Sequence, residues 1–171
     1  QIDTSKNWQD NHLKALRANY GRAKHFPSYA DALGSLYSRR WLRLAEANEA
    51  LLGFLMQSFG INRRIVRSSE LEIPPGADAS EKLAEFVRRV GGDAYLSGPG
   101  GLGYLNPDAF QGLDVLLQDF HHPEFPQLWG PFVPNLSVVD LLLNMGGEDA
   151  RRILEGCGAT RRFPRDHTPA P

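Results

Sequence analysis

A glycine-rich loop and two histidines are the parts of this sequence whose residue types are best suited to chemistry. Gly98, Gly100, Gly101 and Gly103 follow a short apolar stretch and precede an Asn-Pro pair that is typical of a helix start. Glycine lets the backbone approach a ligand closely, and unpaired N–H groups at a helix start attract anions. The loop matches neither the dinucleotide-binding pattern nor the P-loop pattern, so a plain connection explains its spacing equally well.

His122 and His12 are the candidate acid–base residues, because imidazole titrates near neutral pH. His12 lies one helical turn after Trp8, on an apolar stripe that faces either the core or a cleft. For a lone histidine in that position, a core or boundary role is a better explanation than a chemical one.

Nucleophilic and metal chemistry have weaker support in the sequence. Ser97 lacks the nucleophile-elbow pattern, and Cys157 has no histidine partner nearby in the chain. Four neighbouring residues carry metal-binding atoms: Asp119, His121, His122 and Glu124. Adjacent histidines point in different directions in an extended chain, and no familiar ligand spacing is present. We therefore expect no metal and no cofactor.

The composition favours one water-soluble domain. The chain has 171 residues, of which 42% are hydrophobic, and this is enough to bury one core. A formal net charge of -1 does not fit a general nucleic-acid binder. The single cysteine suits a reducing compartment. Because no apolar run reaches membrane-spanning length and no signal-peptide pattern occurs, we expect a cytoplasmic protein with no membrane partner.

Hydrophobic periodicity predicts helices that alternate with strands. Helical patterns cover residues 7–20, 29–37, 40–59, 78–90, 137–145 and 148–154. Strand patterns cover residues 64–67, 94–96 and 113–120. This order predicts an α/β fold with a short parallel sheet, flanking helices and a Rossmann-like three-layer arrangement. We expect a single domain over residues 1–160 and a disordered tail over 161–171.

Two polar residues interrupt otherwise apolar helical patterns. Asn48 is either a buried amide whose hydrogen bonds are satisfied or an amide that points into a polar cleft, and the buried amide is the favoured interpretation. Asp140 follows Ser137, the predicted cap, and a carboxylate in the first turn of a helix is stabilised by the helix dipole. Capping alone therefore explains Asp140.

Polar residues follow all three predicted strands, and parallel strands joined by crossovers end on one side of a sheet. The candidate substrate-binding residues at these ends are Ser68, Ser97, Gly98, Gly100, Gly101, Gln118 and Asp119. We expect an anionic group within about 3 Å of the backbone of residues 98–103, with Tyr104 and His122 as side walls and His12 reaching in.

Four motifs in the same order resemble the WbqC-like proteins. They are Asn7-Trp8-Gln9-x-x-His12, Tyr95-Leu-Ser-Gly98 with Tyr104-Leu105, His122-Pro-x-x-Pro-Gln127, and the stretch from Pro134 to Gly146. The family positions present in this sequence are His12, Ser97, Gly98, Tyr104, His122, Gln127, Asn135, Ser137 and Asp140. The resemblance implies a bacterial protein encoded among genes for O-antigen, other surface glycans or specialised metabolites, with a role in acyl or aminoacyl transfer. It also makes His122 the preferred catalytic residue.

The sequence departs from the family pattern at its beginning. The family's N-terminal His-Gln-Pro-x-Tyr-x-Pro-Trp segment, its Asp-Asp-Val-Gln stretch and its Asn-Arg motif do not occur here. We therefore expect an incomplete domain that lacks the family's N-terminal segment, which a partner chain could supply.

Two functions remain open from the sequence. The first is a transferase that acts on an amino sugar or an amine-bearing metabolite, with a small anionic, nucleotide-linked or carrier-linked substrate. The second is a non-catalytic binding or assembly subunit that docks through the proline-rich and aromatic segment 123–134. Exposure of Phe125, Trp129 and Phe132 in one patch would favour the second.

Overall fold

The computed structural model describes residues 1–73 and 75–164. In these ranges the protein forms six α-helices, three 3-10 helices and a three-stranded mixed sheet. The chain divides into two compact units. The helical unit comprises Gln1–Arg63 with His122–Gly156, and the sheet unit comprises Arg64–His121 with the chain from Cys157 onward. The expectation of one domain over residues 1–160 stays a prediction.

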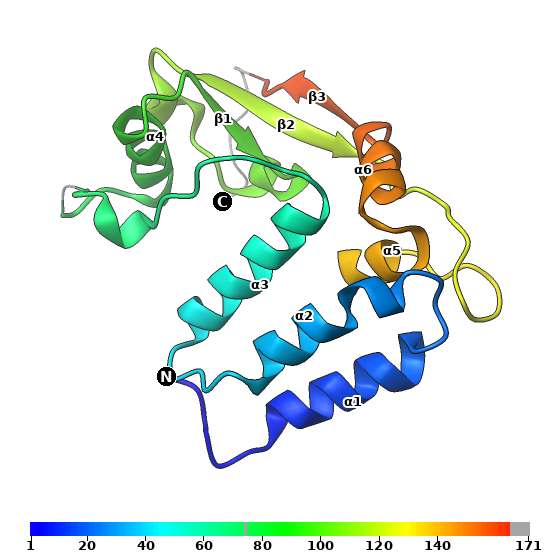
Figure 1. Cartoon of the computed structure of the whole chain (residues 1–171). Helices are drawn as coiled ribbons and strands as arrows, with labels where there is room; N and C mark the ends of the chain where they lie inside the picture. The colour runs from blue at the N-terminus through cyan, green and yellow to red at the C-terminus, as the bar shows by residue number, and fades with distance from the viewer. Residues whose placement is uncertain (74, 165–171) are drawn as a thin grey trace. The chain divides into compact units, whose positions relative to one another are not determined.

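The helical unit contains five of the α-helices. They are α1 (Trp8–Tyr20), α2 (Phe26–Ser38), α3 (Leu44–Ser58), α5 (Val138–Met145) and α6 (Gly147–Glu155). Helices α1 and α2 lie side by side (Figure 1), and α5 contacts both of them. Helix α5 is almost wholly apolar because it is buried on more than one side: Leu142 belongs to one core cluster and Leu143 to another.

Two helices of this unit begin elsewhere than the sequence predicted. Helix α2 starts at Phe26, three residues before the predicted start at residue 29, because Pro27 fits the first turn of a helix, where its missing N–H costs nothing. Helix α3 starts at Leu44, four residues later than predicted. Asn48 is exposed on α3, so its interpretation as a buried amide was wrong.

The sheet unit contains helix α4 and the three strands. Helix α4 (Ala79–Arg89) starts with a capping box, in which Asp78 and Glu81 each bond to the other's backbone N–H. The strands are β1 (Ala94–Ser97), β2 (Asp114–Phe120) and β3 (Gly158–Arg162), and β2 lies between the other two (Figure 1). The core of this unit gathers around Leu117, Leu105, Ala84, Phe110 and Phe163.

The prediction of a parallel sheet was only half correct. Strands β1 and β2 are parallel, with Ser97 paired to Leu117, as predicted. Strand β3 pairs with β2 in the antiparallel direction, so a Rossmann-like arrangement is not observed. Residues 64–67 form no strand and lead into the 3-10 helix η1 (Ser68–Glu70).

Strand β3 extends into the segment that the sequence predicted to be a disordered tail. Arg161 and Arg162 belong to this strand, and Phe163 is buried in the core, so disorder from residue 161 was wrong for these positions. All residues of β3 are exposed, so the strand carries no apolar alternation that the sequence could reveal. The remainder of the predicted tail, residues 165–171, lies outside the described residues. Among the described helices, none combines the length and apolar character needed to cross a membrane.

Candidate functional site

The helical unit contains a hollow of about 360 Å³, which we call the His12 pocket. Its apolar walls are formed by Ile2, Trp8, Tyr37, Leu44, Ala47 and Leu51. Its polar lining residues are Asp3, Lys6, His12 and Asn48. The hollow falls in the size range of small-molecule sites, which are mostly apolar with a few polar groups.

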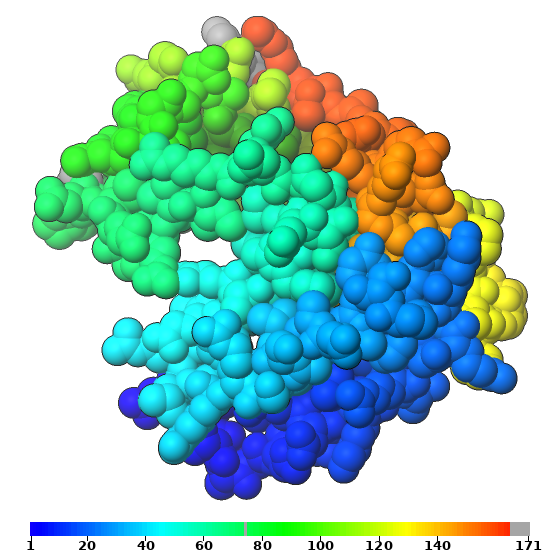
Figure 2. All heavy atoms as spheres, in the orientation of Figure 1, coloured from blue at the N-terminus to red at the C-terminus, as the bar shows by residue number. Residues whose placement is uncertain are grey.

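Four segments are held together around this pocket. The N–H of Ile2 donates a hydrogen bond to the carbonyl of Leu42 at 3.0 Å, which ties the start of the chain to the entry of α3. The beginning of the chain and the start of α3 therefore lie side by side, as Figures 1 and 2 show. The amide of Gln9 on α1 donates to the carbonyl of Tyr37 at 2.8 Å and fixes α1 against the end of α2.

His12 stands in an aromatic cluster that orients its ring. Its ring centroid lies 5.4 Å from that of Trp8 and 6.0 Å from that of Tyr37, and both pairs meet edge to face. Trp8 and Tyr37 also contact each other at 6.2 Å. Burial raises the pKa of the Tyr37 hydroxyl, so this group stays neutral at physiological pH. The exposed imidazole of His12 lines the pocket.

The carboxylate of Asp3 stays ionised. It accepts hydrogen bonds from the hydroxyl of Ser5 at 2.6 Å and from the backbone N–H of Ser5 at 3.0 Å. These two bonds, the hydroxyl first, lower the pKa of Asp3. With Lys6, the N-terminal segment therefore brings one negative and one positive side chain to the pocket.

His122 lies in a different environment. Its Nδ1 is 2.9 Å from the carbonyl of Pro123, which requires the proton on Nδ1 if the two are hydrogen-bonded. Its ring packs at 6.5 Å from that of Phe125 and at 5.8 Å from that of Phe132. The half-buried His122 ring thus forms part of an aromatic cluster that covers the core.

Gln127 and the buried Asp140 belong to one hydrogen-bond network. Gln127 donates to Oδ2 of Asp140 and to the carbonyl of Val133, and accepts from the N–H of Val133. Asn144 donates to Oδ1 of Asp140 at 3.0 Å. Burial, together with the charge and hydrogen bond of Asp140, raises the pKa of Tyr20 to about 12. Asp140 is only 3% exposed, so capping alone does not explain it.

Two further family positions shape the entry of α5. Asn135 has a φ of 61°, a left-handed conformation that asparagine tolerates better than most residues. Ser137 caps α5, because its hydroxyl accepts from the N–H of Val139 at 3.3 Å, as the sequence predicted.

The glycine-rich loop belongs to the sheet unit and forms the 3-10 helix η2 (Pro99–Gly103). The N–H of Gly101 donates to the carbonyl of Gly98 at 3.0 Å, so this amide is used within the loop. A Cβ on Gly101 would lie 2.2 Å from the hydroxyl oxygen of the buried Ser97, so Gly101 is required for packing. Gly98, Gly100 and Gly103 face open space.

Some of the other predicted residues of the sheet unit lie at one edge of the sheet. Ser97 ends β1 beside Leu117, so the ends of β1 and β2 share an edge that also carries Gln118 and Asp119. Ser68 does not follow a strand, and this part of the predicted edge was wrong.

Tyr104 is 54% exposed and interacts with the hydroxyl of Tyr95. Burial, the largest cause, and Tyr104 raise the pKa of Tyr95. The single site that the sequence predicted combines His12 and His122 of the helical unit with residues of the sheet unit. That combination stays a prediction.

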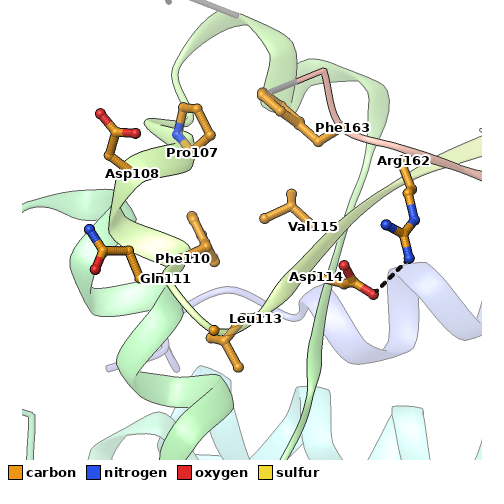
Figure 3. Close-up of a pocket in the computed structure, with 10 residues that line it drawn as sticks. Pro107, Asp108, Phe110, Gln111, Leu113, Asp114, Val115, Arg162 and Phe163 are labelled. Atoms are coloured by element: carbon orange, nitrogen blue, oxygen red, sulfur yellow. Dashed lines mark hydrogen bonds and ion pairs between the residues drawn. The ribbon is translucent and has the colours of Figure 1, made fainter. Parts of the chain in front are cut away.

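A second hollow, of about 240 Å³, lies in the sheet unit (Figure 3). The side chains of Phe110, Val115 and Phe163 line it, and an ion pair between Asp114 and Arg162 at 3.4 Å stands at its side. None of the predicted site residues lines it. In the described part of the chain, no three His, Cys, Asp or Glu residues are grouped so that they could hold a metal ion.

The sequence made His12 a candidate residue but did not predict the pocket that it lines. Tyr37, Leu51 and the N-terminal charges come from segments that are distant from His12 in the chain. The signals in the sequence were the Trp8–His12 stripe and the polar Asn48 within an apolar helical pattern, and all three residues line the pocket.

Comparison with known proteins places the chain in a family. The model of the WbqC-like protein family matches residues 1–152. The chain therefore belongs to the WbqC-like protein family, and the resemblance of its motifs is confirmed.

One relative is the uncharacterized protein Rv1507c of Mycobacterium tuberculosis (strain ATCC 25618 / H37Rv), which is 32% identical over 145 residues. The match covers 82% of this chain and 62% of the relative, so the chain spans less than two thirds of the relative's length. No solved structure matches the chain. The absence of an N-terminal family segment stays a prediction.

Proposed function

We propose that this chain transfers an acyl or aminoacyl group to the amine of an amino sugar or an amine-bearing metabolite, with the His12 pocket as the site of the donor's acyl or aminoacyl group. The observation that carries the proposal is the exposed imidazole of His12 at the edge of a mainly apolar hollow of about 360 Å³. The glycan and specialised-metabolite setting implied by the family resemblance supports group transfer. We place this reaction in the bacterial cytoplasm.

The chemistry requires one base and an activated donor, such as a carrier-linked thioester. The lone pair of the acceptor amine attacks the carbonyl carbon, so a C–N bond forms. The C–S bond breaks, and the thiolate leaves with the bonding electrons. His12 takes the proton that the attacking nitrogen loses and returns it to the thiolate.

His12 is more accessible than His122 to a ligand in the pocket. The Nδ1 of His122 lies beside the Pro123 carbonyl, and its ring packs on the aromatic side chains that cover the core. His12 is exposed and lines a hollow. We therefore prefer His12 to His122 as the catalytic residue.

Kinetics of paired variants test the proposal. A panel of acyl and aminoacyl thioesters with glucosamine as acceptor provides the assay, with the amide product detected by mass. His12→Ala should lower turnover by about 10²-fold, the usual range for loss of a general base. His121→Ala is the matched control, because the His121 side chain is 82% exposed and lies outside the pocket. Equal turnover of both variants would remove His12 from the mechanism.

The contacts of the segment 123–134 argue against its use as a docking surface. Phe125 is buried in the core, and Phe132 packs against it. Trp129 is half exposed, but its indole N–H donates to the Asn19 carbonyl at 2.7 Å and the guanidinium of Arg22 lies 4.5 Å from its ring. These side chains cover α1 and the core, so the segment has a structural explanation.

A further inference from the structure

We infer that the His12 pocket binds an α-amino acid with a large apolar side chain, either free or as the acyl part of a donor. The transfer of this ligand to an acceptor rests on the proposed function, whereas its binding in the pocket does not. It follows from two features of the pocket, which are its apolar walls and the charges beside them.

The apolar walls come from regular helical spacing. Leu44, Ala47 and Leu51 follow one stripe of α3, because residues three and four apart share a helix face. Trp8 and Tyr37 add aromatic surface from α1 and α2. A pocket with this lining has few polar partners for the hydroxyls of a sugar, which would lose hydrogen bonds to water on entering. Each methylene that a ligand buries there should raise its affinity about fourfold.

The charges beside the walls match the two ends of an amino acid. Lys6 offers an ammonium to a carboxylate or an acyl oxygen, and Asp3 offers an ionised carboxylate to an α-ammonium. Asn48 supplies an amide that both donates and accepts. A simple fatty acid would leave the carboxylate of Asp3 without a cationic partner on the ligand, and a simple amine would leave Lys6 without an anionic one.

The hollow in the sheet unit that Figure 3 shows has no comparable pair of charges available to an amino acid. Three charged residues line it, Asp108, Asp114 and Arg162, and Arg162 pairs with Asp114 at 3.4 Å. A zwitterionic ligand would have to break this pair, whereas Asp3 and its Ser5 donors leave carboxylate lone pairs for a ligand.

Calorimetric titration of the chain with a small set of ligands tests the inference. The probes are L-phenylalanine, L-leucine, glycine, 3-phenylpropanoate and 2-phenylethylamine. L-Phenylalanine and L-leucine should each bind at least tenfold more tightly than glycine. Removal of either charged group from the phenylalanine skeleton should weaken binding by about fivefold or more. Equal affinity for glycine and L-phenylalanine, or no binding of any probe, would overturn the inference.

Two variants of α3 locate the binding. Leu44→Asp places a charge in the pocket wall at a position that is 59% exposed, so it should fold and lose at least tenfold in affinity for L-phenylalanine. Leu52→Asp is the control, because Leu52 is exposed on the same helix but does not line the pocket. Thermal unfolding verifies that both variants fold. If both lose affinity equally, or neither does, the ligand does not occupy the His12 pocket.

The ligand series and the transfer assay separate the two claims. Binding of L-phenylalanine without transfer would contradict the proposed function and leave the inference intact. Binding of 3-phenylpropanoate as tightly as L-phenylalanine would contradict the amino-acid inference, while an acyl transferase would still be supported.

Discussion

Nε2 of Gln127 lies 2.8 Å from Oδ2 of Asp140, and this bond joins the segment 123–134 to the first turn of α5. The side-chain amide of Gln127 also donates to the carbonyl of Val133 and accepts from its N–H. Asp140 in turn accepts from Asn144 and interacts with Tyr20. A buried carboxylate with these partners fixes three segments of the helical unit at one point.

Asp140→Asn should destabilise the protein by about 2–3 kcal/mol, because the buried carboxylate accepts from several donors and an amide cannot accept at both positions. Urea unfolding measures the loss. Asp31→Asn is the matched control, since Asp31 is exposed on α2, and it should change the stability by about 0.5 kcal/mol or less. Similar losses in the two variants would show that the network contributes little.

The pKa of Tyr20 gives a pH dependence with a definite sign. Its hydroxyl ionises at about 12 in the folded protein, mainly because of burial and then because of Asp140, whereas an unfolded tyrosine ionises near about 10. Between these values the unfolded state has released the proton and the folded state has kept it. Stability should therefore be unaffected by Tyr20 below about pH 10 and should fall from there to about pH 12.

Comparison with Tyr20→Phe isolates this contribution, because burial also raises the pKa of Tyr37 and of Tyr95. Denaturant unfolding as a function of alkaline pH should show a shallower decline for the variant. The same slope in both proteins would contradict the assignment.

Gly147 at the start of α6 lies against the backbone of α3. A Cβ there would be 1.8 Å from the carbonyl oxygen of Ser58, so Gly147→Ala should cost about 2 kcal/mol or more through overpacking. Gly34 on α2 has no atom within 4 Å of its added Cβ, so Gly34→Ala should instead stabilise by about 0.5–1 kcal/mol. Thermal unfolding compares the two variants. A stable Gly147→Ala protein would mean that α6 and α3 do not pack as observed.

Local signals in the sequence predicted local structure correctly. The helix that begins near Asp78, the Ser137 cap and the strand 94–96 each depend on neighbouring residues, and each is present. Helix periodicity identified all six described α-helices, with errors confined mainly to the ends of α2 and α3.

Features that depend on distant contacts were missed. Strand β3 is exposed at every residue, so only its pairing with β2 makes it a strand. Residues 64–67 have strand-like alternation but form no ladder. The His12 pocket combines Ile2, Tyr37 and Leu51 with His12, and their meeting depends on how α1, α2 and α3 pack. The sequence predicted individual candidate residues. Tertiary packing determines which of them lie together.

Nuclear magnetic resonance of the protein labelled with ¹⁵N at its histidine rings tests most directly whether the ligand binds beside His12. The chain has five histidines, whose signals can be assigned by single substitutions. Titration with L-phenylalanine should shift the ring signals of His12 in a saturable manner and leave those of the exposed His121 unchanged. Shifts confined to His122, or no change at His12 at saturating ligand, would contradict the assignment of the substrate site to this pocket.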